Sequence, residues 1–385
     1  MPNAFSKLDH KFMLRALTLA RRAQGKVEPN PMVGAVLTTN DQTNPVLISE
    51  GYHRAFGGPH AEAHAILNAG GKTQNTTLYV TLEPCCHWGK TPPCTDMILR
   101  TGRGGITRVV IAMEDPFPKV AGGGIKLLRK NNIQVDVGLL EAEAKSLNAP
   151  FISRLTENRP FVIAKWAQSL DGVTALVTGE SQWISSEISR ASVQKIRGRM
   201  DGILVGINTA LTDNPLLMAR PAKGSDIKRI ATRIILDSEC RLPLTSQLVK
   251  TIPFAPVLLV HNKNLSPVAA RRLKALTTKG VMSLALPTDK NNRPQLPALL
   301  KHLAQNDYTN VLLEGGPTLM AAFIRQKLVD EAHIFLAPLI IGGQNPHHAI
   351  TGPDLKKLAH ANRFTFTTIN PSGPDLHIIA HPAQL

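Results

Sequence analysis

The stretch "PHAEAHAI" (residues 59–66) brings His60, Glu62 and His64 into a single turn of an expected helix. Shortly after it, "TLEPCCHWGKTPPCTD" (81–96) carries three of the four cysteines in the chain. Cysteines clustered in this way, in a chain without a disulfide framework, favour metal binding or catalysis. The two stretches together predict a zinc site. Such a site requires residues 59–66 and 81–96 to lie side by side in the fold.

A zinc site of this composition suits the hydrolytic removal of an amine from an aromatic ring. Zn²⁺ held by three protein ligands lowers the pKa of a water in its fourth position. A carboxylate that is not a ligand can take the water proton and deliver it to the leaving amine. His60, Cys85 and Cys94 are the predicted ligands, and Glu62 is the predicted proton carrier. The pattern is the zinc-deaminase signature H-x-E…P-C-x-x-C, with eight residues between the two cysteines in place of two.

Several nearby residues compete for these roles. An isolated H-A-E triplet would be interpreted as polar residues at a helix start, and only the cysteine motif favours zinc. Cys86 competes with Cys85, but the preceding proline favours Cys85. His64 and His87 are expected to be neighbours of the site and not ligands. Cys240, in "LDSECRLP", is expected to be an unreactive buried thiol.

Outward from this site, apolar periodicity alternates between helical and strand patterns. The expected elements are helices at 8–23, 60–70, from 94 and 122–133, and strands at 32–39, 77–83, 108–114 and 134–140. Such alternation predicts a mostly parallel, three-layer α/β domain.

A stretch without a clear period, 145–160, separates the two halves, and we expect domains of 1–150 and 151–385. The second half alternates again and is expected to be α/β. It closes with β-rich segments, 331–343 and 363–382, that favour late antiparallel strands. No motif is assigned to residues 345–385.

Composition restricts the class of protein. A chain of 385 residues is long enough for two cores. It has no apolar run long enough to span a bilayer and no signal-peptide core, so a cytoplasmic location is expected. The net charge of +16 is spread over both halves, with 17 basic and 12 acidic residues up to position 150 and then 27 and 16. The sequence contains no block of basic residues interleaved with aromatic residues, of the kind that single-strand nucleic-acid binders have.

The second half lacks the standard phosphate-binding motifs G-x-G-x-x-G and G-x-x-x-x-G-K-[ST]. It carries "VGINTALTDNP" (205–215) and "LLEGGPTLM" (312–320), in each of which a strand leads through glycine into a helix. Backbone N–H groups at such helix starts can receive a phosphate. Each turn alone is most often an ordinary loop, but the two together favour a nucleotide site.

The extended loop "TLEPCCHWGKTPPC" resembles that of the bifunctional riboflavin-biosynthesis enzymes, which join a pyrimidine deaminase to a reductase. "NPMVGAV" (30–36), "HRAFGGPHAE" (53–62) and "AMEDPFPKVAGGG" (112–124) are similar to the same family. The resemblance implies a cytidine-deaminase-like domain that binds a pyrimidine carrying a ribose phosphate. The implied contacts are Asn30, His53, Lys90 and Asp115. Phe117 departs from the family, which usually has Asn there, so that polar contact is in doubt.

Four segments of the second half, "AKWAQSLDG", "TGESQWIS", "VGINTALTDNPLLMAR" and "LLEGGPTLM", resemble the reductase half of that family, which has a dihydrofolate-reductase-like fold. The implied NADPH contacts are Ala167, Trp183, Thr209, Asp213, Gly316, Pro317, Thr318, Leu319, Met320, Ala321 and Ala322. The implied contacts to the ribitol-phosphate end of the substrate are Ser181, Arg197, Leu217, Arg220 and Glu314. The chemistry agrees, since the two arginines can hold a phosphate and Trp183 offers a flat face for a ring. Solvated arginines and a core tryptophan are the simpler alternatives.

The implied reactions are successive. One Zn²⁺ per chain would support deamination of 2,5-diamino-6-ribosylamino-4(3H)-pyrimidinone 5′-phosphate. NADPH would then reduce the ribosyl chain, which gives 5-amino-6-(5-phospho-ribitylamino)uracil. Phosphorylated small molecules are the expected partners, with no nucleic acid and no membrane, and a homo-oligomer is expected. The main alternative is a nucleic-acid base deaminase fused to a basic RNA-binding module. A purely structural zinc module would leave Glu62 without a purpose.

Overall fold

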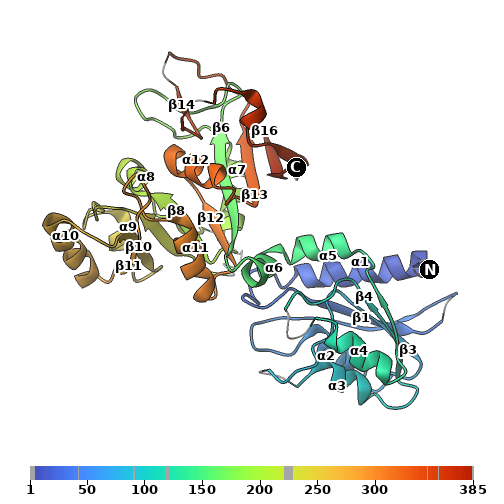
Figure 1. Ribbon diagram of the computed structural model, residues 1–385. Coiled ribbons are helices and arrows are strands. Elements are labelled where there is room, and N and C mark those ends of the chain that lie inside the picture. Colours follow the sequence, from blue (N-terminus) through green and yellow to red (C-terminus); the bar gives the residue numbers. More distant parts are fainter. Residues whose placement is uncertain are drawn as a thin grey trace. The chain divides into compact units, whose positions relative to one another are not determined.

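A computed structural model describes residues 5–41, 43–89, 92–117, 121–220, 229–344, 346–353 and 355–383. The chain divides into two compact units, Met1–Asn158 and Arg159–Leu385, each built around its own large sheet (Figure 1). The stretch without a clear period forms two short helices, α5 (Glu141–Leu147) and α6 (Ala149–Thr156). The expected boundary at 150/151 therefore falls inside α6, and the first unit ends just after that helix.

The first unit has three layers, as predicted. Its sheet has the order β2-β1-β3-β4-β5. Helices α1, α5 and α6 cover one face, and α2, α3 and α4 cover the other (Figure 1). The remaining elements are α1 (Lys7–Arg21), β1 (Gly34–Thr39), β2 (Leu47–Tyr52), α2 (Ala61–Asn68), β3 (Thr76–Val80), α3 (Cys94–Leu99), β4 (Ile106–Ile111), α4 (Gly123–Lys130) and β5 (Gln134–Val137).

The sheet of the first unit is mixed, which corrects the expectation of a mostly parallel one. β3, β4 and β5 run parallel, but β1 is antiparallel to both β2 and β3. β2 was not predicted from the sequence. The segment between β1 and β2 is too short for a helical crossover, so the two strands form a hairpin.

Helix α1 packs very closely on β1. Its N-cap is Ser6, whose hydroxyl accepts the Asp9 N–H at 3.0 Å, while the Asp9 carboxylate accepts the Ser6 N–H. A Cβ on Gly34 would lie 2.0 Å from the carbonyl oxygen of Ala16, so only glycine permits this approach. The apolar face of the helix, including Met13, is buried in the core.

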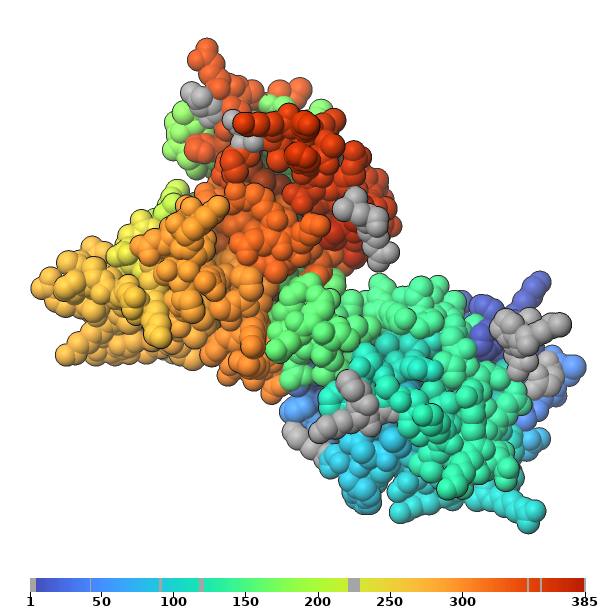
Figure 2. Space-filling model, in the orientation of Figure 1, coloured from blue at the N-terminus to red at the C-terminus, as the bar shows by residue number. Residues whose placement is uncertain are grey.

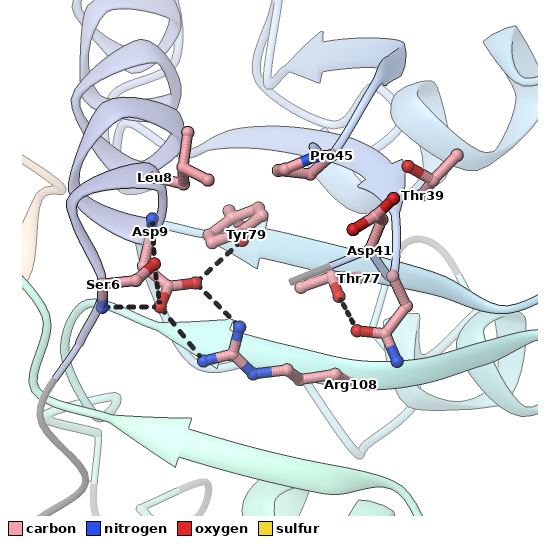
Figure 3. Close-up of a pocket in the computed structure, with 10 residues that line it drawn as sticks. Ser6, Leu8, Asp9, Thr39, Asp41, Pro45, Thr77, Tyr79 and Arg108 are labelled. Atoms are coloured by element: carbon pink, nitrogen blue, oxygen red, sulfur yellow. Dashed lines mark hydrogen bonds and ion pairs between the residues drawn. The ribbon is translucent and has the colours of Figure 1, made fainter. Parts of the chain in front are cut away.

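A buried ion cluster fastens α1 to the sheet (Figure 3). Arg108 on β4 donates to Asp9 at 2.7 Å, and the Tyr79 hydroxyl donates to Asp9 at 2.8 Å. Arg108 also donates to Asp136 on β5 at 2.8 Å. Burial by itself would raise the pKa of Asp9. The hydrogen bonds from Arg108, Ser6 and Tyr79 outweigh burial and lower the pKa to about 2.

The second unit holds a nine-stranded sheet of order β11-β10-β9-β8-β12-β6-β13-β16-β15, parallel from β11 to β13. A two-stranded sheet pairs β14 with β7. The elements are β6 (Phe161–Gln168), β7 (Val173–Ala175), α7 (Glu187–Arg197), β8 (Gly202–Gly206), α8 (Ile207–Asp213), β9 (Thr232–Leu236), α9 (Gln247–Lys250), β10 (Val257–Asn262), α10 (Pro267–Thr278), β11 (Met282–Leu286), α11 (Leu296–Gln305), β12 (Asn310–Leu313), α12 (Pro317–Arg325), β13 (Glu331–Leu336), β14 (His347–His348), η1 (Leu358–His360), β15 (Phe364–Ser372) and β16 (Asp375–Pro382).

Apolar cores cover both faces of this sheet. Successive residues of β12 alternate between them, with Leu312 in one core and Leu313 in the other. Parallel strands buried on both faces have apolar runs of this kind. Cys240 is buried, as predicted. Among the described helices, none combines the length and hydropathy needed to cross a membrane.

The predicted late antiparallel strands are present as β13, β16 and β15. β15 is the edge strand, and the hairpin that it forms with β16 lies at the surface (red in Figure 2). Phe366 and Ile369 on β15 are 60% and 53% exposed.

Candidate active sites

The three predicted zinc ligands meet in the first unit. His60 is the N-cap residue of α2, Cys85 follows β3, and Cys94 begins α3. One ligand atom from each residue lies within 4.8 Å of the other two. His60 Nδ1 is 3.5 Å from Cys85 Sγ and 3.3 Å from Cys94 Sγ. Zn–N and Zn–S bonds of usual length, at a tetrahedral angle, place N and S roughly 3.5 Å apart. The three residues therefore fit a zinc ion.

Glu62 lies in the first turn of α2, is only 3% exposed, and is not one of the three predicted ligands. Burial raises the pKa of its carboxyl to about 7, against the opposing effect of the charge on His60. A carboxyl with a pKa near neutrality can both take and release a proton at physiological pH.

The competing residues lie apart from the ligand cluster, within the part of the chain described. A Cβ on Gly123 would lie 2.9 Å from Cys86 Sγ, so that thiol faces the start of α4. His64 lies against β2, since a Cβ on Gly51 would be 2.6 Å from the His64 Cβ. His87 is exposed. The group that could hold a metal contains none of these three residues.

Two of the implied substrate residues lie beside the cluster. His53 donates from Nδ1 to the Pro59 carbonyl at 3.0 Å, and its Nε2 accepts from the Asn30 amide at 3.3 Å. These partners define a neutral tautomer, and burial lowers the pKa of His53, which keeps it uncharged. Its ring centre lies 5.4 Å from that of His60. Lys90 lies outside the described residues.

Glu83 has a role that the sequence reasoning missed. Its buried carboxylate accepts the N–H groups of Gly122 and Gly124 at 2.9 Å, and those of Asp115 and Ile125 at 3.2 Å. It thereby caps α4, which has no capping side chain of its own. The sequence signal for this role was that α4 begins at glycines, with no Ser, Thr, Asp or Asn at its N-cap position.

Glu83 also brings Asp115 toward the cluster. Burial raises the pKa of the Asp115 carboxyl, with a further rise from the charges of Glu83 and Cys85. The Phe117 N–H donates to Asp115 at 2.8 Å, so the backbone of residue 117 helps to hold the Asp115 carboxylate.

In the second unit the two strand–glycine–helix turns lie together. They follow β8 and β12, which are neighbours in the sheet. The Gly206 N–H donates to the Gly315 carbonyl at 3.1 Å. A Cβ on Gly316 would lie 2.8 Å from Thr209 Oγ1, so the start of α8 approaches the start of α12 closely. This is the carboxyl end of the parallel strands, where open α/β sheets bind ligands.

Glu314, at the end of β12, is the centre of a buried charge cluster. Arg197 donates to it from Nε at 2.5 Å and from Nη2 at 2.7 Å, and Lys165 Nζ lies 3.6 Å away. Burial alone would raise the pKa of Glu314, but the charges of Arg197 and Lys165 outweigh burial and lower it to about 2. Burial lowers the pKa of Lys165. Sequence reasoning missed Lys165, although a lysine within the apolar strand "FVIAKWAQ" was a signal.

Arg197 was expected to offer a free guanidinium to a phosphate, but its guanidinium is paired with Glu314. Its guanidinium fork is used by Glu314, and its Nη1 donates to the Met218 carbonyl at 3.4 Å. Arg220 is exposed, and its N–H donates to the Gln194 side chain at 2.8 Å. Of the two arginines, Arg220 is the one exposed to solvent.

The other implied reductase residues are distributed as follows. Leu217 is buried. The carbonyls of the residues on either side of it accept hydrogen bonds from Arg233 and Arg197. Ser181 and Trp183 lie between β7 and α7. Trp183 is 63% exposed, so it is not a core residue, and the Arg190 guanidinium lies 4.5 Å from its ring centre. Ala167 lies on β6, Thr209 and Asp213 on α8, and Gly316 to Ala322 span the turn and first part of α12.

Comparison with known proteins matches both halves. The family model for the cytidine and deoxycytidylate deaminase zinc-binding region matches residues 6–113, and that for the RibD C-terminal domain matches 160–378. The chain is 38% identical to the riboflavin biosynthesis protein RibD of Bacillus amyloliquefaciens, over 97% of this chain and 96% of that protein. It is 36% identical to RibD of Escherichia coli K12, over 96% and 99%.

Solved structures agree over nearly the whole length. Acinetobacter baumannii RibD, form 1, superposes with a TM-score of 0.85 at 34% identity, over 98% of this chain and 99% of that one. A Thermotoga maritima diaminohydroxyphosphoribosylaminopyrimidine deaminase/5-amino-6-(5-phosphoribosylamino)uracil reductase superposes with a TM-score of 0.80 at 33% identity, over 98% and 99%.

Proposed function

The chain belongs to the RibD family, and from that premise we propose how its residues divide between the two reactions of this bifunctional riboflavin-biosynthesis enzyme. It is a zinc-dependent deaminase and an NADPH-dependent reductase. We assign deamination to the first unit and reduction to the second, which moves the domain boundary from 150/151 to 158/159. The meeting of His60, Cys85 and Cys94 beside buried Glu62 is the observation that carries the deaminase assignment.

For deamination, His60, Cys85 and Cys94 would hold the zinc ion, which would supply a water activated at neutral pH. The Glu62 carboxylate takes a proton from that water and delivers it to the amine that leaves the pyrimidine. Neutral His53 fixes the Asn30 amide, which can pair with an edge of the base. Asp115 and Lys90 are proposed to contact the rest of the substrate, with Lys90 on its phosphate.

For reduction, the paired glycine turns and α12 would hold NADPH, which would supply the hydride for C1′ of the ribosyl chain. As the C1′–H bond forms, the C1′–O bond of the opened ring has broken and its oxygen needs a proton. Lys165, whose half-buried ammonium lies beside Glu314, is proposed to donate that proton. Arg197 holds Glu314 in place, and Arg220 is proposed to contact the substrate phosphate.

The cofactor prediction is a preference for NADPH over NADH. The second half has an excess of basic residues, 27 against 16 acidic, and no acidic residue after a G-x-G-x-x-G turn to take a ribose hydroxyl. A charge-assisted contact to the 2′-phosphate is worth roughly 1.5–3 kcal/mol, or about ten- to a hundredfold. We expect kcat/KM for NADPH to exceed that for NADH by this factor at fixed salt. Equal values would contradict the proposed reductase site.

The homo-oligomer is also a proposal. β15 is an edge strand with Phe366 and Ile369 exposed, and such an edge favours pairing with another chain. Light scattering during gel filtration would test it, with Phe366→Lys as the variant expected to dissociate the assembly. A cytoplasmic location and the absence of nucleic-acid binding are proposed with it. The alternative of an RNA-binding base deaminase is not supported, because the second half matches a reductase family.

The decisive experiment for the whole function uses purified protein. Metal analysis is expected to find one zinc per chain. Oxidation of NADPH should require the deaminated pyrimidine phosphate, or the aminated one with an intact zinc site. Oxidation that did not depend on either pyrimidine would contradict the assignment.

A further inference from the structure

The segment that carries Asn30 reaches the deaminase site without strand pairing. It reads "VEPNPMVG" (27–34), and β1 begins only at Gly34. Pro29 and Pro31 have no N–H group, so they cannot donate to a neighbouring strand. Met32 offers the next backbone donor after Asn30. The backbone partners of Met32 therefore help to set how this segment enters the site, together with the Val33 carbonyl, which accepts the His53 N–H at 3.0 Å.

Asn148 binds that backbone through both of its polar groups. The Met32 N–H donates to Asn148 Oδ1 at 2.8 Å, and Asn148 Nδ2 donates to the Met32 carbonyl at 3.0 Å. The two residues are 116 positions apart in the chain, and Asn148 is 1% exposed. The paired bonds replace those that a neighbouring strand would have made.

Asn148 is also unusual for its place in the chain. It is the N-cap residue of α6, where asparagine normally accepts from the first turn of its own helix. Its side chain makes no such capping bond. The Asn148 carboxamide therefore bonds to Met32, and the first turn of α6 is left without a side-chain cap from this residue.

Short and rigid connections link Met32 to the catalytic cluster, so that the two move together. Pro31 joins Met32 to Asn30 with a fixed φ angle. The Asn30 amide donates to His53, and the His53 ring packs edge-on against His60. A displacement of Met32 would therefore displace the amide proposed to recognise the base.

We propose that Asn148 is a positioning residue for deamination, which sets the Asn30 amide through the Met32 backbone. The inference rests on the substrate role proposed for Asn30. It makes the deaminase pocket depend on the α5–α6 segment, which lies beyond the last strand of the first sheet.

Asn148→Asp tests the proposal with little change of shape. The carboxylate can still accept the Met32 N–H, but its second oxygen faces the Met32 carbonyl and cannot donate. We expect KM for deamination to rise about tenfold, which corresponds to ~1.4 kcal/mol, while kcat changes by less than about threefold. Zinc content and reduction of the deaminated substrate should not change. Asn131→Asp is the matched control, because Asn131 is an exposed asparagine whose side chain, among the contacts described, bonds only to the nearby Leu127 carbonyl.

A double-mutant cycle with Asn30→Ala separates positioning from a general structural role. If Asn148 acts through Asn30, Asn148→Asp should raise KM in the wild type and leave it nearly unchanged in Asn30→Ala. Equal rises in both backgrounds, or no rise in the wild type, would overturn the proposal. If Asn30→Ala alone leaves KM unchanged, the substrate role of Asn30 is wrong and the inference fails with it. Should Asn148→Asp not fold, Asn148→Gln keeps both polar groups, moves them by one methylene, and should raise KM in the same way.

Discussion

The ionisation of Glu62 depends on where α2 places it. The residue is buried at the start of the helix, and the loss of solvent raises the pKa of its carboxyl to about 7. An exposed glutamate would be ionised throughout the physiological range and could not return a proton as readily. The same H-A-E triplet on a surface helix would therefore lack this chemistry.

Replacing Glu62 by glutamine should remove the proton carrier and keep its shape. We expect deamination to fall by about 10²- to 10⁴-fold, because an amide cannot shuttle protons. Zinc content, measured by metal analysis, should stay at one per chain. Reduction assayed on deaminated substrate serves as the internal control and should match the wild type. A variant that deaminates at nearly the wild-type rate would exclude this role for Glu62.

The two adjacent cysteines should differ sharply. Cys85 faces His60 and Cys94, whereas the Cys86 thiol faces Gly123. Cys85→Ser should abolish deamination and sharply reduce bound zinc, since a serine hydroxyl is a poor zinc ligand at neutral pH. Cys86→Ser is the matched control and should leave both nearly intact. The reverse pattern in a zinc titration would show that Cys86 is the ligand.

At the scale of elements, one carboxylate joins three parts of the first unit. Glu83 follows β3 and precedes the proposed metal ligand Cys85. Its carboxylate accepts N–H groups from the start of α4 and, separately, the N–H of Asp115. Gly124 permits this arrangement, because a Cβ there would lie 2.1 Å from the Pro84 carbonyl oxygen. The start of α4 is therefore held directly against the cysteine loop.

Gly124→Ala should force α4 away from that loop. Overpacking of a buried site typically costs ~1–3 kcal/mol, and we expect a loss of this size in the free energy of unfolding. Urea unfolding followed by circular dichroism measures it. Gly89→Ala is the control, because a Cβ on Gly89 meets no atom within 4 Å and its stability should be unchanged. Equal stability of the two variants would show that α4 has room to move.

At the scale of the whole molecule, each unit contains a buried carboxylate held ionised by cations. The pKa of Asp9 in the first unit and that of Glu314 in the second are both lowered to about 2. Because these folded-state pKa values lie below the unfolded ones, the carboxylates stabilise the fold at neutral pH. That stabilisation, roughly 2–3 kcal/mol each, is lost as pH falls from about 5 to 2.

We therefore expect the free energy of unfolding to fall steeply between about pH 5 and pH 2, and Asp9→Asn to flatten part of this fall. Urea unfolding at a series of pH values measures the slope. Loss of zinc in acid affects wild type and variant alike, so the difference between the two isolates Asp9. Parallel slopes would mean that Asp9 has no lowered pKa in the folded protein.

Local patterns in the sequence were sufficient to predict the α/β fold class and to propose the residues of a zinc site. The zinc ligands and Glu62 stand in a spacing that the chemistry requires, and the α/β alternation follows from apolar periodicity. The two glycine turns could be expected to hold a nucleotide because each ends a buried strand and begins a helix. These features depend on residues close together in the chain, and therefore on information that a short window contains.

Tertiary structure alone decided which distant groups meet. The sequence does not show that Arg197 pairs with Glu314, that Lys165 lies beside them, that Glu83 caps α4, or that Asn148 holds Met32. It also left β2 unseen, because the strand is recognisable mainly by its pairing with β1. Apart from the β1–β2 hairpin, each of these features is a contact between segments far apart in the chain. A polar side chain looks the same in sequence whether it is solvated or buried against a partner, and only folding brings the partner within hydrogen-bond distance and removes the water.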